Sequence, residues 1–204
     1  WKPASEDNAV YASVVSQTGN RAALIQSSRN GFFPIPYDIT NAFIRASMGS
    51  IKVVIRLPES FRHGEDDDGK RMLLMALYGL PISPRLWAKT LIKDLVELGW
   101  KESKHEPGVW IKEENGAVVG ILTIYVDDCM LSATNEKKAR AEMKRVHDKH
   151  PVVEIKKEVT EDGTHKFDLL GADVEMNPEK RSLCIHMTNY AKKLLKKFDM
   201  ENCK

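Results

Sequence analysis

A long apolar run in the second half of the chain ends at two adjacent acids. Val118–Ile124 is rich in β-branched residues, which predicts a buried strand, and it leads through Tyr125-Val126 to Asp127-Asp128. A shorter apolar run, Cys129–Ala133, follows, so the pattern predicts a hairpin with two carboxylates at its tip. Adjacent aspartates in an apolar setting repel each other and lose hydration, which a divalent metal ion would relieve. The alternative, commoner for an isolated Asp-Asp pair, is a polar turn without chemistry.

The first third of the chain alternates between helical and extended patterns. Residues 20–30 have the apolar spacing of a short helix with a glycine stop. The prolines of residues 32–37 favour an extended segment that delivers Asp38, after which residues 41–43 begin a turn or short helix. Residues 51–57 alternate as expected for a strand, which Pro58 ends.

The most regular helix precedes the acidic hairpin. Ser83-Pro84 supplies a cap residue and a first-turn proline, and Gly99 stops the helix. Its apolar face consists of Trp87, Leu91, Leu95 and Leu98. A strand at Val109–Ile111 and a hairpin turn at Asn115-Gly116 then lead into the long apolar run.

The last third predicts two helices separated by a hairpin. Asn135 caps a charged helix that runs to about residue 150, and residues 167–176 and 183–187 form a hairpin around residues 177–180. Thr188 caps a final helix with an apolar face and a basic face, made of Tyr190, Leu194, Leu195 and Phe198 and of Lys192, Lys193, Lys196 and Lys197. Mixed helices and strands in mostly antiparallel order indicate an α+β fold.

Composition narrows the classes of function. The 204 residues are 42% hydrophobic and 29% charged, which fits one large globular domain or two small ones. The net charge is only +2, so a nucleic-acid surface has to come from local clusters of Lys and Arg. No apolar run approaches the ~20 residues of a membrane span. The chain lacks an initiator Met, so we expect a piece of a longer polypeptide.

Other residues that could bind metal show no convincing pattern. The cysteines, Cys129, Cys184 and Cys203, are odd in number and unpaired in spacing, which favours a reducing intracellular compartment over a zinc site or a disulfide framework. His147 and His150 lack further ligands nearby. The acidic residues 65–69 lack the ligand spacing of a calcium loop, so we expect a solvated loop there.

Asp38 is a third candidate acid, because it too comes at the end of an extended segment. Phosphoryl transfer to a hydroxyl needs two Mg²⁺ ions roughly 3.5–4 Å apart, held by carboxylates and phosphate oxygens. Asp38, Asp127 and Asp128 would suffice for that chemistry if they converge.

Three segments resemble, in order, the palm motifs of reverse transcriptases. Residues 38–43 (Asp-Ile-Thr-Asn-Ala-Phe) resemble the first motif, residues 77–87 (Leu-Tyr-Gly-Leu-Pro-Ile-Ser-Pro-Arg-Leu-Trp) the second, and residues 125–128 (Tyr-Val-Asp-Asp) the third. Their order and context resemble copia-type retrotransposons from Tyr11 onward, including residues 57–61, 167–171 and 190–200. Any one motif is weak, whereas the ordered set is specific.

The resemblance implies an α+β right-hand polymerase whose palm is ferredoxin-like, with an antiparallel sheet packed on helices. The domains implied are partial fingers in residues 1–32, palm in 33–50, fingers in 51–82, palm with the catalytic hairpin and a primer-grip-like hairpin in 83–187, and the start of the thumb in 188–204. The implied activity is that of an RNA-directed DNA polymerase, which extends a primer with dNTPs during retrotransposon replication.

The resemblance also implies roles for single residues. Asp38, Asp127 and Asp128 would be catalytic and hold two Mg²⁺ ions, or Mn²⁺ as a substitute, together with the backbone carbonyl of Ile39. The nucleotide would contact Ala42, Phe43, Tyr78 and Gly79, with the Phe43 ring excluding a 2′-hydroxyl. The template–primer duplex would contact Tyr125, Ser83, Pro84, Arg85, Leu170, Gly171, Lys192, Lys193, Lys196 and Lys197.

Two features depart from the copia pattern. Pro81-Ile82 stands where the family usually has Lys-Gln, which removes two polar groups near the nucleotide. The family also carries a basic fingers hairpin upstream of the stretch that begins at Tyr11, whereas here only Lys2 precedes it. Arg21 and Arg29 are candidate substitutes, although a surface role is commoner for such residues.

Two other readings of the acids remain open. A catalytically silent reverse-transcriptase-like scaffold would bind nucleic acid or protein, which suits the two departures but not the retention of all three acids. A metal-dependent nuclease would also use clustered carboxylates, but it gives no reason for Phe43. The partners expected of the polymerase are an RNA or DNA template–primer, dNTPs and other Pol segments (RNase H and integrase) outside this chain, without a membrane. We expect it in the cytoplasm, in virus-like particles, or in the nucleus.

Overall fold

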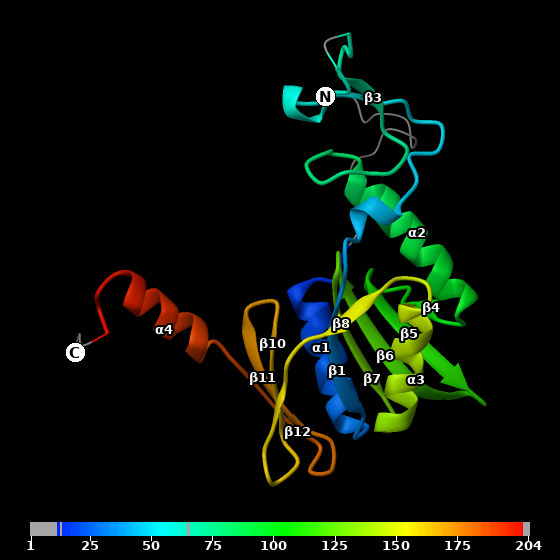
Figure 1. Cartoon of the computed structure of the whole chain (residues 1–204). Coiled ribbons are helices and arrows are strands. Elements are labelled where there is room, and N and C mark those ends of the chain that lie inside the picture. Colours follow the sequence, from blue (N-terminus) through cyan, green and yellow to red (C-terminus); the bar gives the residue numbers. More distant parts are fainter. Residues whose placement is uncertain (1–11, 13, 65, 202–204) are drawn as a thin grey trace. The chain divides into compact units, whose positions relative to one another are not determined.

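The computed structural model describes residues 12, 14–64 and 66–201, which fall into two compact units. The smaller unit contains Asn41–Asp94, and the larger contains Val14–Thr40 and residues 95–201. The boundary falls inside helix α2 (Ser83–Glu97), which Figure 1 shows in green. The predictions for Lys2 and Tyr11 lie outside the described residues, as does Cys203.

The described part of the larger unit is built on a six-stranded antiparallel sheet. Its strands lie in the order β4-β5-β6-β7-β1-β8 (Figure 1). Their bounds are Phe33–Ile39 for β1, Lys101–Glu102 for β4, Val109–Glu114 for β5, Ala117–Tyr125 for β6, Asp128–Ala133 for β7 and Val152–Glu154 for β8. Read from the β8 edge, the four strands β8, β1, β7 and β6 are the fourth, first, third and second of the set in chain order, which is the order of a ferredoxin-like sheet with β1 and β7 as the central pair. The predicted palm fold is confirmed.

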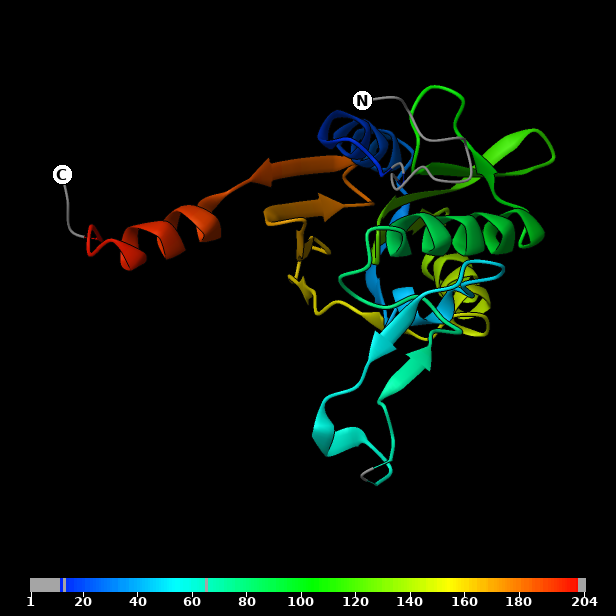
Figure 2. The ribbon, with the colours of Figure 1, turned by 90° about the horizontal axis from the view of Figure 1, so that it is seen from above.

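Helices cover both faces of this sheet. Helix α1 (Gln17–Arg29) lies against β5 and β6, whereas α3 (Glu136–His147) lies against β1, β7 and β8, and Figure 2 shows the two on opposite sides. Residues 120–124 of β6 are therefore buried without interruption, as their apolar run predicted. Thr123 donates a hydrogen bond of 2.8 Å to Asn20 of α1, and this buried polar contact fixes the helix on the sheet.

A second sheet continues the larger unit. Strands β9 (Glu158–Val159), β10 (His165–Leu169), β11 (Ala172–Asn177) and β12 (Ser182–His186) lie in the order β12-β11-β10-β9. An apolar cluster joins this sheet to α1 and β7, and it contains Leu24, Met130, Phe167, Leu169, Val174 and Met176. The segment 167–176, predicted as one strand, is divided by a turn at Leu170-Gly171, where both residues have positive φ.

The smaller unit has little regular structure. It contains the 3₁₀ helices η2 (Phe43–Arg45) and η3 (Glu59–Phe61) and an antiparallel pair, β2 (Val54–Arg56) and β3 (Lys70–Met72). The strand predicted over residues 51–57 is thus formed only by residues 54–56. In the predicted solvated loop, Asp67 accepts hydrogen bonds from the backbone of His63 and Gly69 and pairs with Arg71. This acid organises the loop, and Glu65 lies outside the described residues.

Two helix caps differ from the sequence prediction. The Ser83 side chain does not cap α2: its hydroxyl donates to the Leu77 carbonyl at 2.6 Å and accepts from the Leu77 amide at 3.2 Å. Helix α4 (Thr188–Lys197) is capped not by Thr188 but by Asp173 of β11, which accepts from the Asn189 amide at 2.9 Å.

The apolar face of α2 agrees with the prediction, since Trp87, Leu91 and Leu95 are buried. In the described part of the chain, no helix combines the length and the apolar character that a bilayer crossing demands.

Candidate active site

Strand pairing brings the predicted acids to one place on the six-stranded sheet. Asp38 of β1 lies directly opposite Asp128 of β7, so the two side chains project from the same face. Asp127 occupies the adjoining turn, and its carbonyl accepts a hydrogen bond of 3.0 Å from the Ile39 amide. Tyr125 pairs with Asp128 across the hairpin and is exposed. The acids therefore come from adjacent strand ends.

The pKa values of the acids show that they share one electrostatic environment. Burial raises the pKa of Asp38, and the charge of Asp127 raises it further. Burial likewise raises the pKa of Asp128, with added repulsion from Asp127, Asp38 and Asp168. Within the described residues, none of these acids forms an ion pair with a basic side chain. The described residues thus supply no cation that pairs with this negative charge.

The acids do not form a preassembled metal cage. Among the residues that the structure describes, no three His, Cys, Asp or Glu side chains lie close enough together to hold an ion. The backbone nevertheless places Asp38 and Asp128 at directly opposed positions of β1 and β7.

The strands behind the acids are rigidly packed. Tyr37 and Cys129, each next to a catalytic candidate, pair across β1 and β7, and both are buried. A hydrogen bond joins their side chains, and burial raises the pKa of both groups well above their ordinary values. The two groups stay neutral and serve to fix the strand pair.

The predicted nucleotide-contacting residues lie in the smaller unit. Ala42 is buried, and the half-buried Phe43 ring lies 4.8 Å from the ring of Tyr78, with 56° between their planes. Gly79 follows in a left-handed conformation with φ of +89°, which glycine adopts readily. Ser83 is fully buried and its hydroxyl is engaged by Leu77, so that hydroxyl is not presented to a nucleic acid. Pro84 and Arg85 are partly exposed in the first turn of α2.

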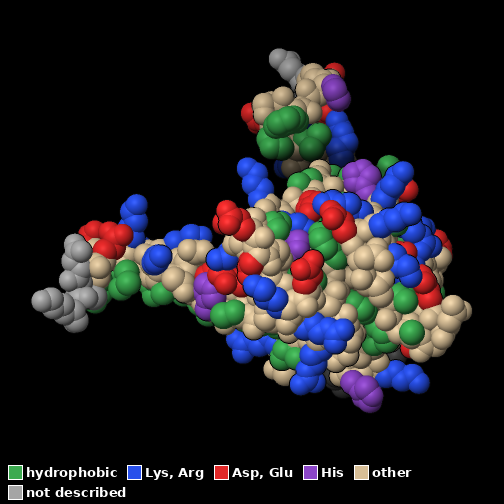
Figure 3. All heavy atoms as spheres, turned by 90° about the horizontal axis from the view of Figure 1, so that it is seen from below, with side chains coloured by type: hydrophobic (Ala, Val, Ile, Leu, Met, Phe, Trp, Pro, Cys, Tyr) green, Lys and Arg blue, Asp and Glu red, His purple; other side chains and the backbone are tan. Residues whose placement is uncertain are grey.

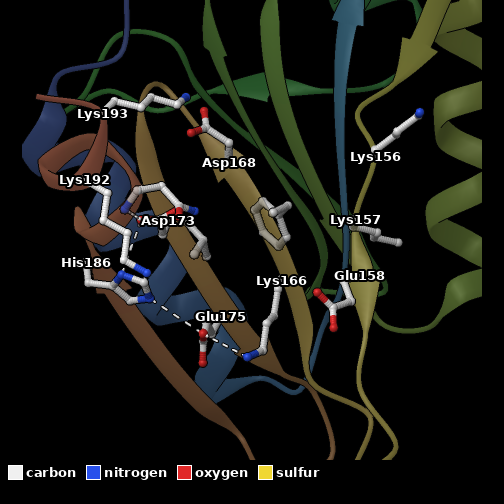
Figure 4. A pocket seen from close by; sticks show the side chains of 13 residues that line it. Lys156, Lys157, Glu158, Lys166, Asp168, Asp173, Glu175, His186, Lys192 and Lys193 are labelled. Carbon is white, nitrogen blue, oxygen red and sulfur yellow. Dashed lines mark hydrogen bonds and ion pairs between the residues drawn. The ribbon is translucent and has the colours of Figure 1, made fainter. Parts of the chain in front are cut away.

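A groove of about 880 Å³ opens beside the second sheet and α4 (Figure 4). Lys192 and Lys193 line it, as does Lys156, and these lysines have no ion pair among the described residues. Lys196 and Lys197, also predicted to bind the duplex, lie on α4 but do not line the groove. Figure 3 shows Lys and Arg side chains (blue) mixed with Asp and Glu side chains (red) on the face of the protein in view.

Asp168 is a site residue that the sequence prediction missed. It lies on β10, accepts a hydrogen bond of 3.1 Å from the Gly171 amide and lines the groove, where Figure 4 shows Lys193 pointing toward it. Its charge reaches Asp128. The hairpin Leu170-Gly171 was identified as a primer contact, and Asp168 precedes it by two residues, which is the signal that could have revealed this acid. Leu170 itself is exposed at the tip.

The ferredoxin-like sheet, with acids at the ends of β1 and of the β6–β7 hairpin, is the palm of a right-hand polymerase. Comparison of sequences gives the family. Residues 4–204 match the family described as "Reverse transcriptase (RNA-dependent DNA polymerase)". The chain therefore belongs to the reverse transcriptase family, as the ordered motifs implied.

The chain is also similar to individual proteins. A Saccharomyces cerevisiae protein named as a putative transposon Ty5-1 protein is 25% identical over 100 residues, which make up 49% of this chain and 32% of that protein. It fits the resemblance to copia-type elements. Among solved structures, telomerase of Candida tropicalis matches 84% of this chain with 14% identity and a TM-score of 0.44, and telomerase of Candida albicans matches 97% with 12% identity and a TM-score of 0.45. The chain covers 40% of each telomerase chain.

Proposed function

We propose that the chain is the polymerase portion of a retrotransposon reverse transcriptase and extends a primer with dNTPs by nucleotidyl transfer. The observation that carries the proposal is the register of β1 and β7, which sets Asp38 opposite Asp128 beside the Asp127 turn, without a basic partner among the described residues. This arrangement fits a site whose charge is balanced by metal ions and substrate.

The donor set fits magnesium. The three carboxylates and the Ile39 carbonyl offer only oxygen atoms, which Mg²⁺ and Mn²⁺ prefer. When bound, two such ions supply neutralisation of the attacking and leaving oxygens and of the nucleotide phosphates. The residues of the chain would hold the reactants: Asp38, Asp127 and Asp128 would bind the ions, Phe43 would border the sugar, and Lys192 and Lys193 would contact backbone phosphates without reading sequence.

A silent scaffold is the second candidate, and Pro81-Ile82, in place of the Lys-Gln of the copia pattern, favours it. A primer-extension assay separates the two. We expect a labelled primer to lengthen on RNA and on DNA templates with Mg²⁺ and dNTPs, and to stay unextended with excess EDTA. Binding of template–primer without extension, also by a version with more N-terminal sequence, would favour the scaffold. The expected RNase H and integrase partners also belong to this proposal, and a test of them needs a protein that contains those segments.

A further inference from the structure

The rings of Phe43 and Tyr78 touch within the smaller unit, and they differ in how they are held. Their centroids lie 4.8 Å apart with a tilt of 56°, within the range that aromatic pairs favour. Phe43 is half-buried, whereas Tyr78 is 52% exposed. A large part of Tyr78 therefore faces solvent, while its ring covers one side of Phe43.

The backbone on both sides of this ring pair is tied to buried residues. The carbonyl of Phe43 accepts from the amide of Ala46 at 3.0 Å, and Ala46 in turn pairs with Ala76 at 2.8 Å. Next to Tyr78, both backbone groups of Leu77 are bound by the hydroxyl of Ser83, which has no exposed surface. The Tyr78 ring thus projects from a fixed turn.

We propose that Tyr78 is a positioning residue for sugar selection: its ring holds Phe43 in the orientation that excludes a 2′-hydroxyl, and Ser83 holds the turn that carries Tyr78. A phenylalanine side chain has several staggered rotamers, and a neighbouring ring selects among them. Ser83 then acts from the interior and not as a contact to the duplex. This inference rests on the proposed function and assigns a cause to the selectivity of the same site.

A direct contact between Tyr78 and the nucleotide would predict a different result, and a double-mutant cycle distinguishes the two. If Tyr78 acts through Phe43, removing its ring matters only while Phe43 is present. If Tyr78 touches the nucleotide itself, its removal adds to the effect of a Phe43 variant.

The experiment compares kcat/KM for a dNTP and the matching rNTP in single-nucleotide primer extension. We expect Tyr78→Ala to lower the dNTP/rNTP ratio of kcat/KM roughly 3- to 10-fold, mainly because kcat/KM for the rNTP rises. This factor is the shift between Phe43 rotamers that the energy of an aromatic pair can maintain. Tyr78→Phe keeps the ring and should keep the ratio. In a Phe43→Val background, Tyr78→Ala should change the ratio no further. Phe61→Ala, an exposed aromatic of the same unit, is the matched control and should resemble the parent.

An unchanged ratio in Tyr78→Ala, or effects of the two substitutions that simply add, would overturn the inference while leaving the polymerase activity established. A parent protein that extends no primer with either nucleotide would overturn the proposed function and this inference with it. Thermal unfolding of Tyr78→Ala should match the parent, because a half-exposed ring contributes little to the core. Should that variant melt early, Tyr78→Leu offers apolar cover without the flat ring, and the same loss of ratio is expected.

Discussion

Val126 has the most strained backbone in the catalytic hairpin. Its φ is +63°, a left-handed conformation that β-branched residues adopt only under constraint, at a cost of about 1–3 kcal/mol. We predict that Val126→Gly raises the free energy of unfolding by about 0.5–1 kcal/mol, since glycine relieves the clash but loses more chain entropy. Urea unfolding measures this. Val153→Gly, at an exposed strand position, is the control and should destabilise instead. Equal destabilisation by both would show that Val126 is not strained.

Asp127 repels its neighbours in the metal-free protein, since its charge raises the pKa of both Asp38 and Asp128. We predict that Asp127→Asn lowers primer extension about 100-fold or more while the melting temperature stays equal or rises slightly, because one of three repelling carboxylates is removed. Asp66→Asn, at an exposed acid, controls for loss of one charge. If Asp127→Asn melts well below the parent, Asp127 is a structural turn residue.

Candidate site residues that belong to the ordered motifs could be predicted from the sequence. Those that depend on how distant elements pack together could not. Asp38, Asp127 and Asp128 end apolar runs, so the strand pattern alone indicated them. Asp168 has no such signal of its own, because its approach to Asp128 depends on how the second sheet packs. The ring contact of Phe43 with Tyr78 likewise has no local signal in the sequence, since 35 positions separate the two residues.

Helix α4 depends on an acid from another element for its attachment. The carboxylate of Asp173 accepts hydrogen bonds from the Asn189 amide and side chain, and these bonds lower its pKa, as do the nearby His186 and Lys193. A lowered pKa means that this stabilisation is complete above the ordinary Asp value of about 4 and is lost as pH falls through the lower folded value. We therefore predict that α4 loosens in acid.

Hydrogen exchange of the Asn189 amide measures this attachment. Protection should fall as pH drops below about 4, after correction for intrinsic exchange, and Asp173→Asn should show weak protection already at neutral pH. Asp199→Asn, beyond the end of α4, should behave as the parent does. Protection that does not depend on pH in the parent would mean that Asp173 does not hold the helix.

The lysines of α4 provide a second prediction at this scale. Lys192 and Lys193 line the groove, whereas Lys196 and Lys197 do not, so the pairs serve as matched variants of one helix. We expect Lys192→Ala/Lys193→Ala to reduce the slope of log affinity against log salt for a labelled template–primer by about 1–2, since each phosphate contact contributes about 0.9. The Lys196→Ala/Lys197→Ala pair should change it less. Fluorescence anisotropy measures both slopes, and an unchanged slope for the first pair would remove α4 from the binding surface.

Elements set by local physics were predicted well, and those set by distant partners were not. The Asn115-Gly116 turn has positive φ at both residues, and Asn135 caps α3 by accepting from the Lys138 amide, as their sequence signals required. The cap predicted at Ser83 was wrong because the Ser83 hydroxyl binds the backbone of Leu77. The cap predicted at Thr188 was wrong because Asp173 caps α4 instead. The apolar face of α4 remains exposed in the described structure, so its helical spacing predicted a helix but not its burial.

At the scale of the whole molecule, the palm was predicted by the family resemblance and not by the strand pattern. The order of strands along the chain does not by itself give their order in a sheet, so the fold of the family had to supply it. The domain boundaries implied by that resemblance stay predictions. The observed units divide at residues 40 and 94, inside what was assigned to the palm, since compactness and polymerase subdomains are different criteria.

Phe43→Val tests the proposed role of Phe43 in sugar selection. With the acids intact, a smaller side chain should admit ribonucleotides, so we predict a dNTP/rNTP ratio of kcat/KM that falls about 10-fold or more, while dNTP incorporation falls less. If Phe43 only packs within the smaller unit, Phe43→Val should lower the free energy of unfolding, by at most the ~2–4 kcal/mol of a fully buried site and by less for a half-buried ring. In that case kcat/KM should fall by the same factor for both nucleotides. Single-turnover incorporation with each nucleotide, beside urea unfolding, separates these outcomes. A changed ratio at unchanged stability would mean that the Phe43 ring meets the sugar of the nucleotide.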